Sequence, residues 1–413
     1  MKIGLIWHSV YPWDVRLEKI ADACIEAGHS VSIVCKGRIG LAERETINGA
    51  NVSRVFSKAV ANSVGSKFAT YPLFFNPLWR AKTLAAFDNA GVDVVVVRDL
   101  PLANLALWVG KQLRRPVLID MAENYPAALV AYQKLTYRPL LVNNAWLPRK
   151  YEEQAVHRFD HLLVVAEEQR RRLITLGVDP ARITIVGNTP VQSFVDAGAT
   201  PGEETTGCRD LNLLYVGNLD KHRGAHLLIL ALSKLINEFP RARLTLVGDG
   251  NHREALIALA RKLHLEGAVH FSGRVEWSRI ADFIRQSTIC LIPHIKSEHT
   301  DTTLPNKLFD YMAFSKPVIG SDCAPLKRII EQERCGDVFR SGDINDLVAA
   351  LRRTAKSASS LAQGKNGRVA IAREYNWNVD KGRLLDALEQ VTHRANNSLA
   401  INTFHSTPTA VCA

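Results

Sequence analysis

The sequence predicts an α/β protein in which two domains are each built around a parallel β-sheet. Short continuous apolar runs, such as VVVV at 94–97, alternate with longer segments whose apolar residues recur at helical spacing. Such runs are typical of parallel strands that are covered on both faces. The alternation stops in a stretch rich in Gly, Ala, Thr, Pro and Glu at 191–208, which indicates a linker, and then starts again. A chain of 413 residues is long enough for two domains.

Composition narrows the class further. The hydrophobic fraction of 47% and the charged fraction of 23% are those of a globular protein in water. No apolar run is long enough to span a membrane, and the N-terminus MKIGLIWHSV enters a strand pattern directly without signal-peptide features. The seven cysteines are scattered and have no metal-site or disulfide spacing. We therefore expect a cytoplasmic protein with reduced thiols and no metal ion.

The net charge of +11, from 52 basic and 41 acidic side chains, predicts an anionic partner. This partner could be a phosphate-bearing substrate, an anionic membrane surface or nucleic acid. The basic residues are dispersed along the chain and no nucleic-acid-binding motif is present, so nucleic acid is not expected.

The first domain opens with a strand at 2–7, a helix from about 16 to 27 and a strand at 31–35. The first loop is not a G-x-G-x-x-G, so a dinucleotide cofactor, and with it a dehydrogenase, is not indicated. Asp14 and Arg16 are polar groups at the tip of this loop and are candidate site residues. Asp14 could equally be the N-cap of the helix.

Residues 66–82 interleave five aromatic side chains with Lys67, Arg80 and Lys82, and two prolines interrupt the stretch. Aromatic side chains flanked by cations can sit in a membrane interface. They can also pack beneath a loop. Both interpretations stay open on the sequence alone.

Further along, strands at 92–99 and 116–120 flank a helix that ends at about 113. Active-site loops of open α/β sheets follow the carboxyl ends of the strands, so Asp99, Asp120 and Glu123 are site candidates. Glu123 could position or deprotonate a hydroxyl group, or it could belong to a structural turn. A helix at 148–157, a strand at 161–166, a basic helix and a strand at 182–190 complete the first domain.

The second domain repeats the pattern with a strand at 211–217, a loop from Asn218 to Gly224 and a helix at 225–235. A strand, a glycine-bearing loop and a helix form a cradle for phosphate, because the loop and helix N–H groups point at the anion. Arg223 would add a cation there, although it could also be a surface residue. Further strands are expected at 243–250, 268–275 and 287–293.

Residues 301–322 are expected to form a loop, a helix and a strand. Pro305 suits the first helical turn, and Thr302 and Thr303 could cap the helix. Asn306 and Asp310 lie four residues apart on one face, where a carboxylate can accept hydrogen bonds from the two hydroxyls of a ribose. Lys307 adds a cation. The alternative is an ordinary amphipathic helix with solvated polar residues.

The stretch LPNKLFDYMAFSKPVIGSD resembles the nucleotide-sugar-binding helix of the retaining GT-B glycosyltransferases of family 4, or group 1. Asp310 takes the place of the second acid of their hallmark pair, and Thr302 replaces the first. In their Gly-Arg-x₄-Lys-Gly pattern Arg223 takes the lysine position, whereas Asn218 replaces the arginine, which Lys221 or His222 could offset. In their Asp-x-His-Glu pattern Glu123 is retained and Ala122 replaces the histidine.

The resemblance implies a GT-B fold, that is, two Rossmann-like domains facing across a cleft with a nucleotide-sugar between them. It assigns domains at 1–195 and 209–375, a helix at 376–395 that crosses back to the first domain, and leaves a tail at 396–413, which we expect to be disordered. The loop at 294–300 would lie over the donor sugar. The implied catalytic residues are Arg223, Glu123 and Lys307; the implied donor-binding residues are Gly217, Asn218, Arg274, Val275, Thr302, Leu304, Asn306 and Asp310; and the acceptor-side candidates are Asp14, Arg16 and Asp99.

The expected activity is transfer of a sugar, with retained anomeric configuration, from a nucleotide-sugar to a hydroxyl of a glycan or lipid-linked acceptor. The setting would be bacterial cell-surface polysaccharide synthesis, at the inner face of the membrane through residues 66–82. Two alternatives stay open. One is a nucleotide-sugar epimerase or hydrolase, which would use the same fold, and the other is a non-catalytic nucleotide-sugar-binding partner of another transferase. The base, the sugar, the acceptor and the linkage stay open.

Overall fold

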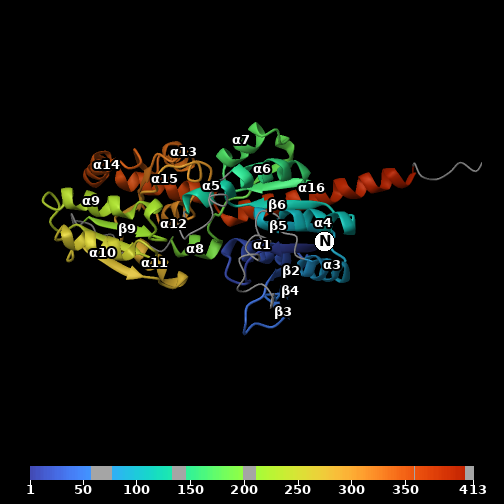
Figure 1. The fold of residues 1–413 in the computed structure, drawn as a ribbon. Coiled ribbons are helices and arrows are strands. Elements are labelled where there is room, and N and C mark those ends of the chain that lie inside the picture. Colours follow the sequence, from blue (N-terminus) through green and yellow to red (C-terminus); the bar gives the residue numbers. More distant parts are fainter. Residues whose placement is uncertain (57–76, 133–145, 199–210, 358, 405–413) are drawn as a thin grey trace, which may run out of the picture.

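The computed structural model describes residues 1–56, 77–132, 146–198, 211–357 and 359–404, with side chains described as far as residue 397. Two lobes lie next to each other in Figure 1, and each is built around one sheet covered by helices. The predicted α/β class with two parallel-sheet domains is confirmed.

The first sheet has the strand order β3-β4-β2-β1-β5-β6-β7-β8. Every pairing in it is parallel except that of β3 with β4, a short pair that the sequence did not indicate. The strands are β1 (Lys2–Trp7), β2 (Ser30–Lys36), β3 (Arg44–Ile47), β4 (Ala50–Val55), β5 (Val94–Arg98), β6 (Val117–Met121), β7 (His161–Val164) and β8 (Ile183–Ile185). The helices of this lobe are α1 (Val15–Glu26), α3 (Pro77–Ala90), α4 (Ala103–Leu113), α5 (Tyr125–Ala131), α6 (Trp146–Ala155) and α7 (Glu167–Thr175).

The second sheet is parallel throughout and has the order β11-β10-β9-β12-β13-β14. Its strands are β9 (Asn212–Val216), β10 (Arg243–Val247), β11 (Val269–Gly273), β12 (Ile289–Ile292), β13 (Val318–Ser321) and β14 (Gly336–Phe339). Its helices are α9 (Ala225–Leu235), α10 (Arg253–Lys262), α11 (Trp277–Gln286), α12 (Lys307–Ala313), α13 (Ala324–Glu333), α14 (Ile344–Lys356) and α15 (Ser360–Arg373).

The linker departs from the prediction. Residues that were expected to be irregular form α8 (Gln192–Ala197), so the predicted domain end at residue 195 falls inside a helix. Phe194 stacks on Trp277 with ring centroids 5.0 Å apart and meets Phe314 edge-on. Two apolar side chains in a segment of small and polar residues therefore attach α8 to the core of the second domain.

The last helix, α16, is longer than predicted. It begins at Trp377, one residue after the predicted start, and continues to Phe404, so the tail expected at 396–413 is helical in its first part. No glycine or proline stands between Gly382 and Pro408, and nothing in the sequence therefore stops the helix at residue 395. Figure 1 shows α16 running back along the first lobe, where Leu384, Leu388 and Val391 join a core that also contains α1 side chains.

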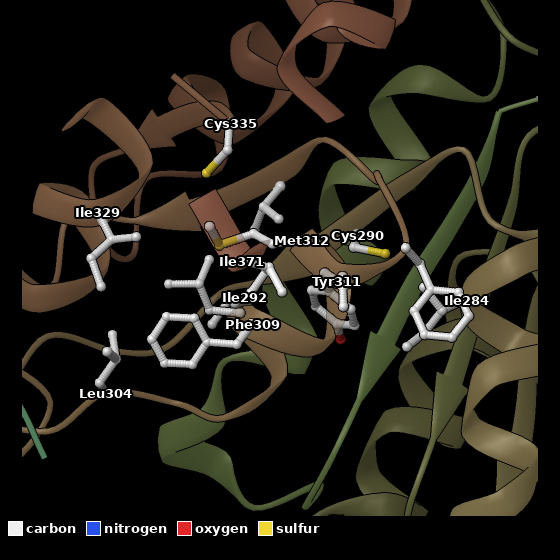
Figure 2. Close-up of a cluster of buried hydrophobic side chains, with 14 of the residues drawn as sticks. Ile284, Cys290, Ile292, Leu304, Phe309, Tyr311, Met312, Ile329, Cys335 and Ile371 are labelled. Carbon is white, nitrogen blue, oxygen red and sulfur yellow. The ribbon is translucent and has the colours of Figure 1, made fainter. Parts of the chain in front are cut away.

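Helix α12 is held by its apolar face. Phe309, Tyr311 and Met312 are buried among side chains of β12, α13 and α15, as Figure 2 shows. The helix begins later than predicted, so Pro305 precedes it and Asn306 stands at its N-cap without a side-chain cap bond. The hydroxyls of Thr302 and Thr303 do not cap it, because they donate to carbonyls of the preceding turn at Glu298 and His299.

Candidate interdomain site

Segments that follow strand ends in the two sheets meet at Tyr132, immediately after α5. Its hydroxyl lies 3.2 Å from Glu123 Oε1 in the first domain. The same hydroxyl lies 3.3 Å from His299 Nε2 and 3.4 Å from Arg223 Nη2, both in the second domain. We call the group Glu123, Tyr132, His222, Arg223, His294, His299 and Lys307 the interdomain site.

Arg223 and Lys307 supply cations to this site. Arg223 ends the short 3-10 helix Lys221–Arg223 before α9, and Lys307 opens α12. Neither side chain pairs with a carboxylate among the described residues. Burial lowers the pKa of Lys307 well below its ordinary value, and the nearby Arg223 charge lowers it further. A bound anion would relieve both effects, since an opposite charge favours the protonated amine.

Gly217 makes room for the Lys307 side chain. Its φ of +138° suits glycine, and a Cβ at this position would come within 2.5 Å of Lys307 Nζ. The ammonium also lies 4.1 Å from the ring centroid of Tyr215, so a cation–π contact holds it at the end of β9. Only the resemblance to the family predicted that Gly217 and Lys307 belong to the same site.

Asp310 lies one turn beyond Lys307 and is buried. Burial raises its pKa to about 7, although the charges of Lys19 and Lys307 act in the opposite direction. Lys19 comes from α1 of the first domain, where its ammonium donates to the carbonyl of Thr189 at 2.8 Å. The carboxyl group of Asp310 therefore faces charge from both domains and changes its protonation near neutral pH.

The acceptor-side candidates form a buried ionic network instead of a loop tip. Arg16 is 4% exposed, and its guanidinium donates to both carboxylate oxygens of Asp120 at 2.5–3.0 Å. Asp14 caps α1 by accepting from the N–H of Leu17 at 2.8 Å, which is the structural interpretation that the sequence left open. The prediction that Arg16 is a loop-tip group is wrong, because α1 begins at Val15 and the Arg16 side chain serves Asp120.

Asp99 belongs to the same network. It takes a φ of +60°, its carboxylate accepts from Arg98 at 2.7 Å, and it also accepts from the N–H of Ala122 at 3.1 Å. Burial raises the pKa of Asp99 to about 7, while the Arg98 charge opposes the shift. Asp99 thus fixes the turn that carries Glu123, and Arg98 is a central cation that sequence reasoning missed.

The remaining predicted donor-binding residues differ in exposure. Asn218, Arg274 and Asn306 are exposed, whereas Thr302 and Leu304 are buried. Val275 packs against the core around α12. Sequence reasoning did not single out Tyr132, Lys19 or the approach of His294 and His299 to His222, because each of these contacts joins residues far apart in the chain.

A cavity of about 740 Å³ lies between α7, α13 and the start of α16. Of the predicted site residues, Leu304 alone lines it among the described residues. Its arginines are matched by acids, since Arg328 binds Glu168 at 2.7 Å, Arg373 binds Glu333 at 2.9 Å and Arg383 contacts Asp380 at 3.4 Å. The cavity therefore offers less uncompensated positive charge to a phosphate than the interdomain site does.

The described residues bear on two further questions, membrane insertion and metal binding. None of the helices they form is both long and apolar enough to span a bilayer. No group of three or more His, Cys, Asp or Glu side chains is arranged to hold a metal ion within the described part of the chain.

Comparisons with known proteins address the whole chain. The family model described as "Glycosyl transferases group 1" matches residues 207–369, and the model described as "Glycosyl transferase 4-like domain" matches residues 14–189. The phosphatidyl-myo-inositol mannosyltransferase of Mycolicibacterium smegmatis is 23% identical over 406 residues, which cover 95% of this chain and 94% of that protein.

Solved structures show the same fold. Sucrose-phosphate synthase from Thermosynechococcus elongatus matches with a TM-score of 0.74 at 19% identity, over 95% of this chain and 100% of that one. The Anabaena protein HepE in complex with UDP matches with a TM-score of 0.72 at 13% identity, over 94% of this chain and 100% of that one. Taken with the two family models, these similarities show that the chain belongs to the GT-B glycosyltransferases of family 4.

Proposed function

We propose that this glycosyltransferase moves a sugar from a nucleotide-sugar to a hydroxyl of a glycan or lipid-linked acceptor, with retention of the anomeric configuration. The supporting observation is the pair of cations, Arg223 and Lys307, which converge on one site without a carboxylate partner among the described residues. Breaking the glycosidic bond leaves charge on the diphosphate, and positioned cations stabilise that charge. Asp310 would bind the donor ribose.

Glu123 would position the acceptor hydroxyl. It comes from the first domain, and its carboxylate already accepts from the Tyr132 hydroxyl at 3.2 Å, so it can accept from a substrate hydroxyl in the same way. Because the diphosphate charge is met by side chains, we propose that no metal ion takes part. Turnover should then be unchanged by excess EDTA, and its loss on chelation with recovery on adding Mg²⁺ or Mn²⁺ would contradict this.

A lipid-linked acceptor at the inner face of a membrane, in cell-surface polysaccharide synthesis, is the setting we propose. A relative that is named for phosphatidyl-myo-inositol supports it. The first domain also carries exposed large apolar side chains, at Trp13, Val15, Ile39, Leu78, Leu129, Val130, Trp146 and Leu147. Of the stretch expected to touch the membrane, 66–76 lies outside the described residues, and Trp79 is only 5% exposed and packs in the core.

The membrane contact is tested by cosedimentation with vesicles containing anionic lipid. Replacing both Trp13 and Trp146 with Ala should release the protein from the pellet, because exposed tryptophans anchor in the interface. Replacing the exposed Trp277 of the second domain should leave binding intact. Equal binding of the two variants would remove these side chains from the contact.

The donor site is tested by thermal shift with a panel of nucleoside diphosphates and nucleotide-sugars. We expect a rise in melting temperature that is selective for one base and is lost in the Arg223→Ala, Asp310→Ala double variant. Arg261→Ala is the control, because Arg261 is an exposed cation at the end of α10 in the same domain. A shift that survives in the double variant would place the nucleotide elsewhere.

A further inference from the structure

Three histidines of the interdomain site come from two chain segments that pack in direct backbone contact. His222 lies in the 3-10 helix after β9, and His294 and His299 follow β12. The N–H of Ile295 donates to the carbonyl of His222 at 3.0 Å. A Cβ at Gly224 would lie 1.8 Å from the Pro293 carbonyl oxygen, so the two segments are as close as glycine permits.

Tyr132 connects this cluster to the first domain. Its ring centroid lies 5.1 Å from that of His222 and 5.3 Å from that of His299. The hydroxyl of Tyr132 is hydrogen-bonded to Nε2 of His299, so the other ring nitrogen of His299 can bond to a different partner.

Each of the three rings has a buried nitrogen with no hydrogen-bond partner among the described residues. These atoms are Nε2 of His222, Nε2 of His294 and Nδ1 of His299. His294 and His299 are only 2% and 3% exposed. Buried polar atoms are normally hydrogen-bonded, so three unpartnered nitrogens in one cluster indicate a site that a ligand completes.

The charges facing the cluster are mostly positive. Arg223 and Lys307 act on His222 and His294, and Arg223 acts on His299. The opposing carboxylates are Asp220, which acts on His222, and Glu123, which is reached through Tyr132. Burial first, and these cations second, lower the pKa of His222 and His299 to about 4 and that of His294 well below its ordinary value.

We propose that His222, His294 and His299 together take up a proton when a diphosphate binds at Arg223 and Lys307. The inference rests on the proposed function, which brings the diphosphate of a nucleotide-sugar to these two cations. The anion replaces net positive surroundings with negative charge, which favours the imidazolium form. The proton comes from solvent and adds to the lone pair of a ring nitrogen. The resulting N–H group then donates a hydrogen bond to a phosphate oxygen.

The proposal has a consequence for the reaction. A proton taken up with the donor sits beside the leaving diphosphate and offsets part of the charge that develops on it. Release of the nucleoside diphosphate product would return the proton to solvent. The diphosphate contribution to donor binding, which pyrophosphate reports without the ribose, should therefore strengthen as the pH falls through the range in which the bound histidines titrate.

The test is isothermal titration calorimetry with inorganic pyrophosphate, at about pH 6.5 and in buffers of different ionisation enthalpy. Pyrophosphate lacks a ribose and so does not engage Asp310, whose own titration would otherwise contribute. The slope of the observed enthalpy against the ionisation enthalpy of the buffer gives the net number of protons exchanged on binding, to which Lys307 and pyrophosphate itself also contribute. The share of the histidines is the difference between the wild type and a histidine variant.

We expect uptake of a proton by the wild type, reduced by about one proton per pyrophosphate in the His222→Gln, His299→Gln double variant, with binding about tenfold weaker. His161→Gln is the matched control, because His161 is also buried with a lowered pKa but lies on β7 beside Thr184. His161→Gln should keep the wild-type uptake. Equal uptake in the wild type and the double variant would overturn the proposal.

Two further outcomes separate this inference from the proposed function. If nucleoside diphosphates bind in the thermal-shift panel but pyrophosphate binding has the same buffer dependence in the wild type and in the histidine double variant, the histidine proposal is wrong and the donor site stands. If no nucleoside diphosphate binds at all, the proposed function fails, and the histidine proposal fails with it.

Discussion

Arg223 is the side chain on which the donor site depends most. Arg223→Gln keeps a hydrogen-bond donor and removes the charge, and hydrogen bonds to charged groups are worth about 1.5–3 kcal/mol. We expect the affinity for the selected nucleoside diphosphate to fall by about 10- to 100-fold, measured by calorimetry. The neighbouring Lys221 is exposed, so Lys221→Gln should change the affinity by less than about threefold. Similar losses in both variants would show that only the overall charge matters.

Asp310 gives the nucleoside part of the donor its own pH dependence. Its raised pKa of about 7 means that the carboxyl is neutral below that pH and ionised above it. An ionised carboxylate accepts stronger hydrogen bonds from ribose hydroxyls. The affinity for a nucleoside diphosphate, relative to pyrophosphate, should therefore rise as the pH rises through about 7 and stay flat in Asp310→Asn. A ratio that is flat in the wild type would remove Asp310 from the ribose contact.

The sequence predicted the placement of residues that stand in local motifs. Arg223, Lys307 and Asp310 stand at fixed positions in short motifs, and the structure places each of them at or beside the interdomain site. Tyr132 and His299 are 167 positions apart, and no local pattern joins them. The prediction for Arg16 was wrong for a related reason, because its hydrogen-bond partner Asp120 is 104 positions away.

At the scale of elements, the turn between β9 and α9 is fixed by Gly224. Its φ is +75°, and a side chain there would meet the Pro293 carbonyl. Gly224→Ala should lower the free energy of unfolding by about 2 kcal/mol or more, because the two segments must separate. Weaker pyrophosphate binding should accompany the loss, since the same segments carry the histidines.

Gly382 provides the matched control in α16. A Cβ there has nothing within 4 Å, and the helix needs no special backbone angle at this position. Gly382→Ala should therefore raise the stability by about 0.5–1 kcal/mol, measured by chemical unfolding. A loss of stability in this variant, or none in Gly224→Ala, would contradict these element-level assignments.

Buried strands and amphipathic helices were predictable because their apolar patterns are local. The weakly patterned pair β3 and β4 was missed, and α8 and the end of α16 were assigned to irregular chain. In α8 the deciding contact is the stacking of Phe194 on Trp277, which belongs to another element. Contacts with other elements determine the structure of these segments, and a local sequence pattern does not show such contacts.

At the scale of the whole molecule, buried and half-buried histidines in both domains link stability to pH. Burial lowers the pKa of His8, His161, His222 and His299 to about 4. Between about pH 6.5 and 4 the unfolded chain then binds more protons than the folded chain at these four histidines. Their contribution to the free energy of unfolding of the protein therefore decreases as the pH falls through this range. Asp99 and Asp310 act in the opposite direction, because their pKa values are raised to about 7.

The variant His161→Gln isolates one of these contributions. Its melting temperature, relative to that of the wild type, should improve between about pH 7 and 5, because the variant has no buried imidazole to keep neutral at this position. A difference between the two proteins that does not change with pH would show that His161 has its ordinary pKa in the folded state.

We expect the nucleotide to bind where the two domains meet at Tyr132, rather than in the cavity between α7, α13 and the start of α16. The most direct test is a crystal structure of the protein with the nucleoside diphosphate that raises its melting temperature. We predict phosphate oxygens within hydrogen-bond distance of Arg223 and Lys307, with the ribose at Asp310. A nucleotide bound instead against Arg170 and Arg328, in the cavity between α7 and α13, would contradict the account.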